Sequence, residues 1–112
     1  MNYMLLIYSD HKDDAAQEQA GIMADYGAFT QGIVASGHFK SADRLQIPST
    51  ATTVRIRDGK TLTTDGPFAE TREQLGGYYL IEAKDLDEAV AIAAKVPSAK
   101  YGSIEVRPVW SM

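Results

Sequence analysis

Apolar residues follow two alternating spacings along this chain, one typical of strands and one typical of helices. Residues 3–8 form a short, nearly continuous apolar run, the pattern of a strand that is covered on both faces. Residues 14–36 repeat apolar positions at helical spacing, which predicts an amphipathic helix. Its apolar positions are Ile22, Tyr26, Phe29 and Ile33. Asp14 and Gln17 have the spacing of a capping box. Gly21 and Gly27 inside the helix predict either close packing or a local irregularity there.

The second half of the chain contains a hairpin pattern and another strand, helix and strand. Residues 38–46 are weakly patterned and predict a strand that fades into a loop. Residues 52–57 alternate apolar and polar side chains, and Asp58-Gly59 follows them, so this region predicts a two-residue hairpin. The remaining predicted elements are a strand at 78–83, a helix that is capped by Asp85 and Glu88, and a final strand at 103–110.

This order of elements predicts an α+β sandwich in one domain, residues 1–112. Two helices that follow strands of one sheet cover the same face of that sheet, because both crossovers are right-handed. The other face then lacks a cover, although the first strand is apolar on both sides. Pairing with a second copy of the same sheet is the economical solution. The sequence therefore predicts a homodimer.

The loop at residues 63–79, TTDGPFAETREQLGGYY, is the least regular part of the pattern. Asp65 can accept backbone hydrogen bonds, Gly66 tolerates unusual backbone angles, and the next residue is a proline, which fixes φ. We therefore expect a stiff loop. Phe68 is apolar among polar neighbours, so it is predicted to anchor the loop in the core and to place the surrounding charges.

Composition and charge narrow the classes of function. The apolar share is 45%, the charged share is 23%, and the net charge of -4 supplies no basic footprint for nucleic acid. With no cysteine there is no disulfide framework or zinc-thiolate site. We see no ligand spacing for a metal and no phosphate loop, and we predict no cofactor. The first apolar run is too short for a membrane span or a signal peptide, so a cytoplasmic location is expected.

The residues from 65 to 83, DGPFAETREQLGGYYLIEA, resemble the signature of the DGPF branch of the YCII-related domain family. Three further matches, YMLLIYSD, TATTVRIRDGK and VPSAKYGSIEVRPV, extend the resemblance over nearly the whole chain. It implies a ferredoxin-like protomer, with a hairpin inserted between two β-α-β units, that pairs into a dimeric αβ-barrel. Most of the family has no assigned reaction. Some members are encoded with extracytoplasmic-function sigma factors, which implies a regulatory alternative.

The resemblance also bears on Tyr26. In related enzymes a helix histidine and an aspartate are proposed as an acid/base pair, and Tyr26 stands roughly where that histidine would lie. A tyrosine with a pKa of about 10 is a poor base at neutral pH, but it can donate a hydrogen bond to a developing oxyanion. Asp65 is then the candidate base, and its competing role is simply to form the turn before Gly66.

The other candidate binding residues each have a structural alternative. Glu70 and Arg72 can bind a polar molecule, or they can be solvated charges that bridge to a partner chain. Arg107 can form an anion site with Arg55 and Arg57, or these side chains can pair with Glu105 across strands.

The aromatic and histidine candidates also have both a functional and a structural alternative. Tyr8, Tyr26, Tyr78 and Tyr79 can line a pocket or pack in the core. His38 has a pKa suited to proton transfer but has no second acid nearby in sequence, and His11 lies in a polar loop and is predicted to be solvated.

Two classes of function remain open. The first is a homodimer with a small-molecule cavity beside the loop at residues 65–72, which binds a small organic acid. Proton-transfer chemistry such as isomerisation or elimination would use Asp65 as base and Tyr26 or an arginine as anion stabiliser. The ligand contacts would be Tyr8, Phe68, Tyr78 and the charged residues above. The second is a non-catalytic regulatory protein that acts with a sigma factor. The sequence does not decide between an enzyme and a binding protein.

Overall fold

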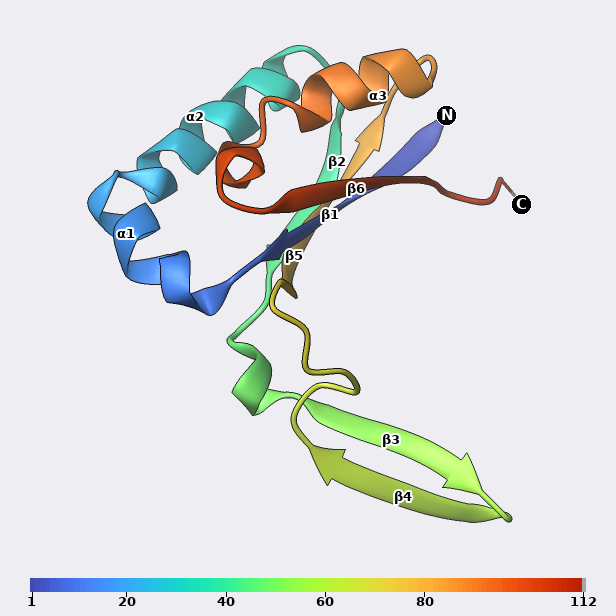
Figure 1. The fold of residues 1–112 in the computed structure, drawn as a ribbon. Coiled ribbons are helices and arrows are strands. Elements are labelled where there is room, and N and C mark those ends of the chain that lie inside the picture. The colour runs from blue at the N-terminus through green and yellow to red at the C-terminus, as the bar shows by residue number, and fades with distance from the viewer. Residues whose placement is uncertain (112) are drawn as a thin grey trace.

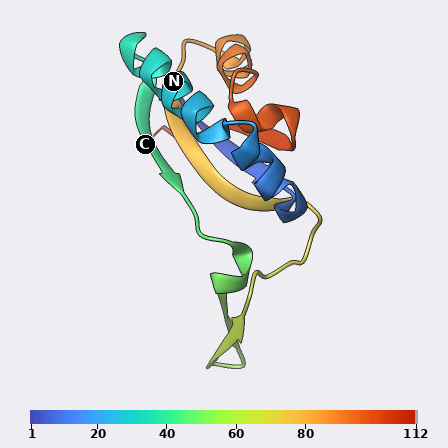
Figure 2. The ribbon, with the colours of Figure 1, turned by 90° about the vertical axis from the view of Figure 1, so that its left-hand side faces the viewer.

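Four antiparallel strands form one sheet, and the helices cover one of its faces (Figures 1 and 2). The computed structural model describes residues 1–111. The strands are β1 (Asn2–Ser9), β2 (Phe39–Arg44), β5 (Gln74–Glu82) and β6 (Ser103–Pro108), in the spatial order β2-β5-β1-β6. This is the ferredoxin-like α+β arrangement that the sequence predicted, with an inserted hairpin between β2 and β5.

The first predicted helix is divided by its glycine. The pieces are the 3₁₀ turn η1 (His11–Asp13), α1 (Asp14–Gln19) and α2 (Ile22–Ala35). Gly21 separates α1 from α2 with φ of 81°, a left-handed angle that glycine adopts readily, so the predicted irregularity is confirmed. The predicted capping box is wrong, because Asp14 is the first residue of α1 and the cap position falls on Asp13.

The remaining helical segments follow the sequence pattern more closely. They are η2 (Pro48–Thr50), α3 (Leu86–Ala93) and η3 (Pro97–Lys100). The Asp85 carboxylate accepts a hydrogen bond from the backbone N–H of Glu88 at 2.9 Å, which confirms the predicted cap of α3. No helix in the described part of the chain, residues 1–111, is both long and apolar enough to cross a membrane.

The core lies between the sheet and the helices. Alternate residues of β1 and β5 point into it, and α2 and α3 close it from above. Its buried members include Tyr3, Leu5, Ile7, Ile33, Tyr79, Ile81, Ala89, Ile92 and Val96. The other side chains of β1, Met4, Leu6 and Tyr8, are half-buried on the opposite face. One chain therefore covers β1 on one face only, and the second cover that its apolar pattern predicts is not supplied by the chain itself.

The hairpin projects beyond the ends of β2 and β5, and we call residues 52–65 the arm (Figure 1). Its strands are β3 (Thr52–Arg57) and β4 (Lys60–Asp65), and Asp58 and Gly59 both have positive φ, as the predicted two-residue turn requires. The radius of gyration is 15.8 Å, whereas a compact chain of this length has about 13 Å. The difference reflects the arm.

Phe68 does not anchor its loop in the core. Its side chain is 80% exposed, so this prediction is wrong for the single chain. The loop begins at the base of the arm, where the N–H of Gly66 donates to the carbonyl of Ala51 at 2.7 Å. Because that base already stands outside the sheet and helices, the residues immediately after it do not reach the core.

Candidate functional site

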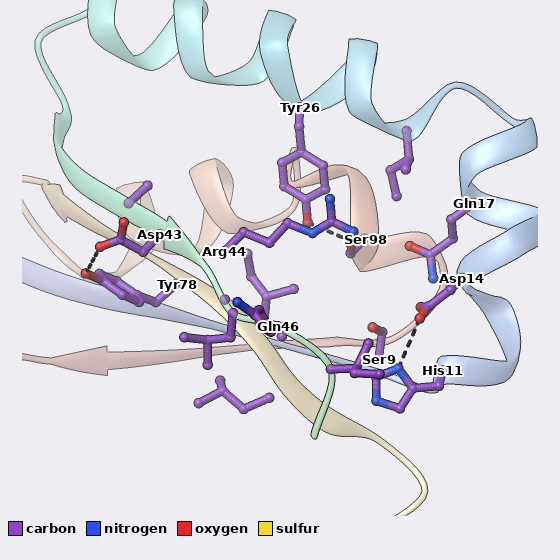
Figure 3. A pocket seen from close by; sticks show the side chains of 18 of the residues that line it. Ser9, His11, Asp14, Gln17, Tyr26, Asp43, Arg44, Gln46, Tyr78 and Ser98 are labelled. Atoms are coloured by element: carbon purple, nitrogen blue, oxygen red, sulfur yellow. Dashed lines mark hydrogen bonds and ion pairs between the residues drawn. The ribbon is translucent and has the colours of Figure 1, made fainter. Parts of the chain in front are cut away.

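A cavity of about 280 Å³ lies at the end of the sheet from which the arm departs (Figure 3). Its walls come from the ends of β1 and β2, the start of β5, α1, α2 and η3. The polar side chains that matter most are His11, Asp14, Gln17, Tyr26, Arg44 and Ser98. The cavity therefore gathers residues from five separate segments of the chain.

The glycine pair of the loop shapes the floor of this cavity. The pairing of β1 with β5 shifts register after Ile7, which faces Gly77, whereas the next residue of β1 faces Leu75. Gly76 is thus the extra residue of a bulge. A Cβ on Gly77 would stand 2.8 Å from the carbonyl oxygen of Asp43, so only glycine allows β2 to approach β5 here. The pair lies inside β5, which therefore begins earlier than the strand predicted at 78–83.

The Tyr26 side chain projects from α2 into the cavity, and its hydroxyl stays protonated. Its hydroxyl donates to the Ser98 Oγ at 2.7 Å, and its ring stacks on Tyr79 with a centroid separation of 6.4 Å. Burial raises the pKa of the Tyr26 phenol above its ordinary value, and the hydrogen bonds with Ser98 offset part of that rise. A neutral phenol joined to a buried serine can present hydrogen bonds to a ligand without acting as a base.

Gln17 presents a buried amide to the same cavity. Only 6% of the residue is exposed, and its Nε2 has no hydrogen-bond partner among the described residues. Figure 3 shows this amide on α1, with its oxygen on the side of Tyr26 and Ser98 and its nitrogen on the side of Asp14. A buried donor without a partner costs about 1–3 kcal/mol. The structure therefore leaves this buried donor without a partner among the described residues.

Arg44 places a cation at the edge of the cavity, at the end of β2. Its Nη1 contacts the sulfur of Met23 at 3.5 Å, and no carboxylate of residues 1–111 lies within salt-bridge distance. Figure 3 shows the guanidinium below the Tyr26 ring and near Ser98. A guanidinium in this position can bind a carboxylate or another oxyanion through two parallel hydrogen bonds.

His11 and Asp14 form a hydrogen-bonded pair at the mouth of the cavity. The His11 Nδ1 and an Asp14 carboxylate oxygen are 3.0 Å apart, and both side chains are about half exposed. One ring nitrogen of His11 is hydrogen-bonded to the Asp14 carboxylate, and the other is open to a ligand or solvent. This is the arrangement by which a carboxylate orients an imidazole for proton transfer.

Tyr78 and Asp43 stand beside this site on the open face of the sheet. The Tyr78 hydroxyl donates to the Asp43 carboxylate at 2.6 Å, and this hydrogen bond raises the pKa of Tyr78 above its ordinary value. Both residues border the cavity.

Within one chain, the predicted site residues separate into three groups. Tyr26 and Tyr78 line the cavity, whereas the predicted base Asp65 is exposed on β4 and lines neither hollow. Glu70 and Arg72 line a second, more open hollow of about 450 Å³, which also borders His11. The single chain does not bring Asp65 and Tyr26 together.

The other predicted contacts also lie away from the cavity. Tyr8 points to the open face of the sheet, and Phe68 is exposed beside the arm. Arg107 is exposed on β6, and its Nε donates to the Glu105 carboxylate at 2.8 Å. Of the two alternatives for Arg107, the structure shows the pairing, although within one strand rather than across strands.

Sequence reasoning missed most of the polar lining. It assigned Asp14 and Gln17 to a helix cap and His11 to solvent, and it gave no role to Arg44 or Ser98. The spacing of His11 and Asp14, three residues apart in a polar turn, was the one local signal for their pairing. The other contacts join residues that are far apart in the sequence.

His38 belongs to a different cluster. Its Nδ1 lies 2.6 Å from the Ser36 Oγ, and its Nε2 lies 3.1 Å from the Glu88 carboxylate. These bonds tie the end of α2 to the start of α3, and neither hollow includes them. We assign this cluster a structural role.

Comparisons with known proteins agree with this fold. A profile of the YCII-related domain matches residues 1–112. An uncharacterised protein of Rhizobium meliloti (strain 1021) is 40% identical over 114 residues, which cover 97% of this chain and 92% of the relative. Among solved structures, a complex of 5-chloro-2-hydroxyhydroquinone dehydrochlorinase from Burkholderia phenoliruptrix AC1100 with 2,5-dihydroxybenzoquinone is similar, with a TM-score of 0.59. That similarity covers 99% of this chain and 94% of the other at 13% sequence identity, so it concerns the fold.

Proposed function

We propose that this chain, which belongs to the YCII-related domain family, binds a small organic acid in the cavity beneath Tyr26. The observation that carries the proposal is the buried Gln17 amide, whose Nε2 has no partner among the described residues. Folding leaves such a donor unpaired at a cost, and a carbonyl or carboxylate oxygen of a ligand would remove that cost. The ligand therefore carries an acceptor at this position.

Charge and size limit the ligand further. Arg44 supplies an unpaired guanidinium, which favours an anionic group. Tyr26 and Ser98 supply hydroxyl groups beside it. The volume of about 280 Å³ lies at the lower end of the range for small-molecule sites. We infer a single-ring or short-chain acid with one oxyanion at Arg44 and a second oxygen at Gln17.

The ligand of the similar solved structure has this size and chemistry. The Burkholderia dehydrochlorinase is described in complex with 2,5-dihydroxybenzoquinone, a single ring with acidic hydroxyl and carbonyl groups. The likeness concerns the fold alone, so it does not assign this ligand to the present chain. It makes hydroxylated quinones and phenolic acids the first compounds to test.

As an enzyme, this site would transfer a proton. His11, oriented by Asp14, would take a proton from a carbon next to a carbonyl group. The electron pair left behind would move onto the carbonyl oxygen, where the Gln17 amide or Arg44 stabilises the charge. Return of the proton to another atom gives isomerisation, and departure of a leaving group gives elimination. Asp65, the base predicted from the sequence, would take part only in an assembly that brings it to a cavity.

A homodimer is part of the same proposal. The open sheet face exposes a row of partly buried apolar side chains from β1 and β5, and a second copy of this face would cover them. The row consists of Met4, Leu6, Tyr8, Tyr78 and Leu80. The regulatory alternative, with a sigma factor as partner, stays a prediction, and the described residues present no observation that favours it over the cavity.

A thermal-shift screen tests the binding proposal. Wild type is heated with benzoate, hydroxybenzoates, 2,5-dihydroxybenzoquinone, short dicarboxylates and phosphate, alongside Gln17→Leu and Arg44→Met. A ligand at a hundred times its dissociation constant adds about 2.7 kcal/mol to the free energy of unfolding. We expect an organic acid to raise the Tm of wild type and to lose most of that effect in both variants. Arg72→Met, outside the cavity, is the matched control. Equal shifts in all four proteins, or none in wild type, would contradict the proposal.

A further inference from the structure

The two faces of the arm differ sharply in charge. In the pairing of β3 with β4, directly opposite residues project to the same face. One face carries Thr52, Val54, Ile56, Thr61, Thr63 and, at its base, Asp65. The other face carries Thr53, Arg55, Arg57, Lys60, Leu62 and Thr64. Apart from the carboxylate at the base, the first face is uncharged and rich in β-branched residues, whereas the second presents three cations.

No part of residues 1–111 covers the uncharged face. Val54 and Ile56 are 60% and 58% exposed, and every residue of β4 is exposed. Figures 1 and 2 show that neither the sheet nor the helices pass over the arm. A two-stranded hairpin alone is at best marginally stable in water. A flat, apolar, uncovered hairpin is also prone to aggregation. The arm therefore requires a partner whenever the chain is folded.

A second copy of the chain meets this requirement best. It is present at equal concentration whenever the protein is present, and a pair of copies can cover both arms at once. Charge agrees with this choice. The arm holds three basic and two acidic residues, so the rest of the chain holds eight basic and thirteen acidic ones. An arm of net positive charge that reaches a body of net negative charge gains from that attraction.

The segment that leads into the arm, residues 45–48, also forms a wall of the cavity. Residues 45–48 connect β2 to η2, and all four line the cavity described above. The N–H of Leu45 is bonded to the carbonyl of Gly76 at 2.9 Å, whereas Ile47 is 56% exposed. The position of this wall therefore depends on where the arm is held.

We propose that the uncharged face of the arm docks on a second copy of this chain, and that this contact fixes the cavity wall formed by residues 45–48. The docking is argued from the arm alone, whereas the importance of the cavity wall rests on the proposed function. Docking buries valine, isoleucine and threonine side chains that are exposed in the single chain. Release of the arm would loosen the wall and weaken any ligand contact that depends on it.

Sedimentation equilibrium of three full-length proteins tests the docking. Wild type is compared with the double variant Val54→Asp/Ile56→Asp and with Leu62→Asp, a matched apolar-to-acidic change on the cationic face. We expect a dimer for wild type and for Leu62→Asp, and a dissociation constant at least tenfold higher for the double variant. A monomeric wild type, or equal dissociation constants for all three proteins, would overturn the proposal.

Excision of the arm separates docking from misfolding. Replacement of residues 53–64 by Gly-Gly joins positions that already meet, since Gly66 and Ala51 are hydrogen bonded at the base. We expect this variant to melt cooperatively and to show the same weakened association as the double variant. A folded variant without the arm that dimerises like wild type would overturn the docking.

Hydrogen exchange tests the wall without any ligand. Amide exchange at residues 45–47 is measured in wild type, in Leu62→Asp and in the double variant at equal concentration. We expect at least tenfold faster exchange in the double variant and no change in the control. Unchanged exchange in a variant that has become monomeric would overturn the link to the cavity. Because this readout involves no ligand, it stays informative even if the screen finds no organic acid.

Discussion

Replacement of Gln17 by leucine is expected to make the ligand-free protein more stable. Leucine has a similar size and no polar group, and the residue it replaces is 6% exposed with an unpartnered Nε2. Removal of a buried, unpaired donor recovers the cost of its desolvation, about 1–3 kcal/mol. The entropy of unfolding for a chain of this length makes each kcal/mol worth about 4 °C in Tm. We therefore expect Tm to rise by about 4–12 °C.

Scanning calorimetry of three proteins measures this effect. Wild type and Gln17→Leu are compared with Gln19→Leu, which makes the same change at an exposed position of α1 and so controls for helix propensity. We expect a higher Tm for Gln17→Leu but not for Gln19→Leu. We also expect Gln17→Leu to lose the stabilisation by an organic acid. A lower Tm for Gln17→Leu than for Gln19→Leu would show that the amide is already satisfied, and it would refute the argument that the site lacks an acceptor.

Three further predictions concern single residues that stabilise the fold or line the cavity. Gly102→Ala places a Cβ against the carbonyl oxygen of Tyr8, so we expect chemical denaturation to show a loss of about 3 kcal/mol. Tyr26→Phe removes a buried hydroxyl, and we expect a loss of about 1 kcal/mol together with weaker binding of an organic acid in the thermal-shift assay. The Glu88 carboxylate has a pKa below its ordinary 4.5, because it accepts a hydrogen bond from the backbone N–H of Lys84 and a second from a histidine. Its stabilisation is present above pH 4.5 and is lost as the pH falls through the lowered pKa, so denaturation curves of wild type and Glu88→Gln should differ at pH 7 and converge once the pH lies below that lowered pKa.

Local sequence patterns predicted the fold correctly because the features that they report are local. The hairpin turn needs two residues with positive φ, and Asp58-Gly59 supplies them. The free N–H groups at the start of α3 need an acceptor, and Asp85 supplies one to the N–H of Glu88, three residues later. The division at Gly21 was anticipated for the same reason. Each of these features depends on residues within a few positions of one another.

The same local reasoning failed for Phe68 and for the cavity. An apolar residue in a polar loop predicts burial only if the loop lies against the core, and here the arm carries the start of that loop away from it. The cavity brings Gln17, Tyr26, Arg44 and Ser98 together, although these residues lie up to 81 positions apart in the sequence. Nothing in the spacing of these residues places them together.

The sequence by itself thus determined the strands, the helices, the hairpin and the order of elements, because hydrophobic period, caps and turn residues act over short distances. Only the tertiary structure decided which polar side chains face one another. The approach of α1 and η3 to the end of β2 left the Gln17 amide without a partner and Arg44 without a carboxylate among residues 1–111. The crossing of chain segments, rather than any single motif, created the site.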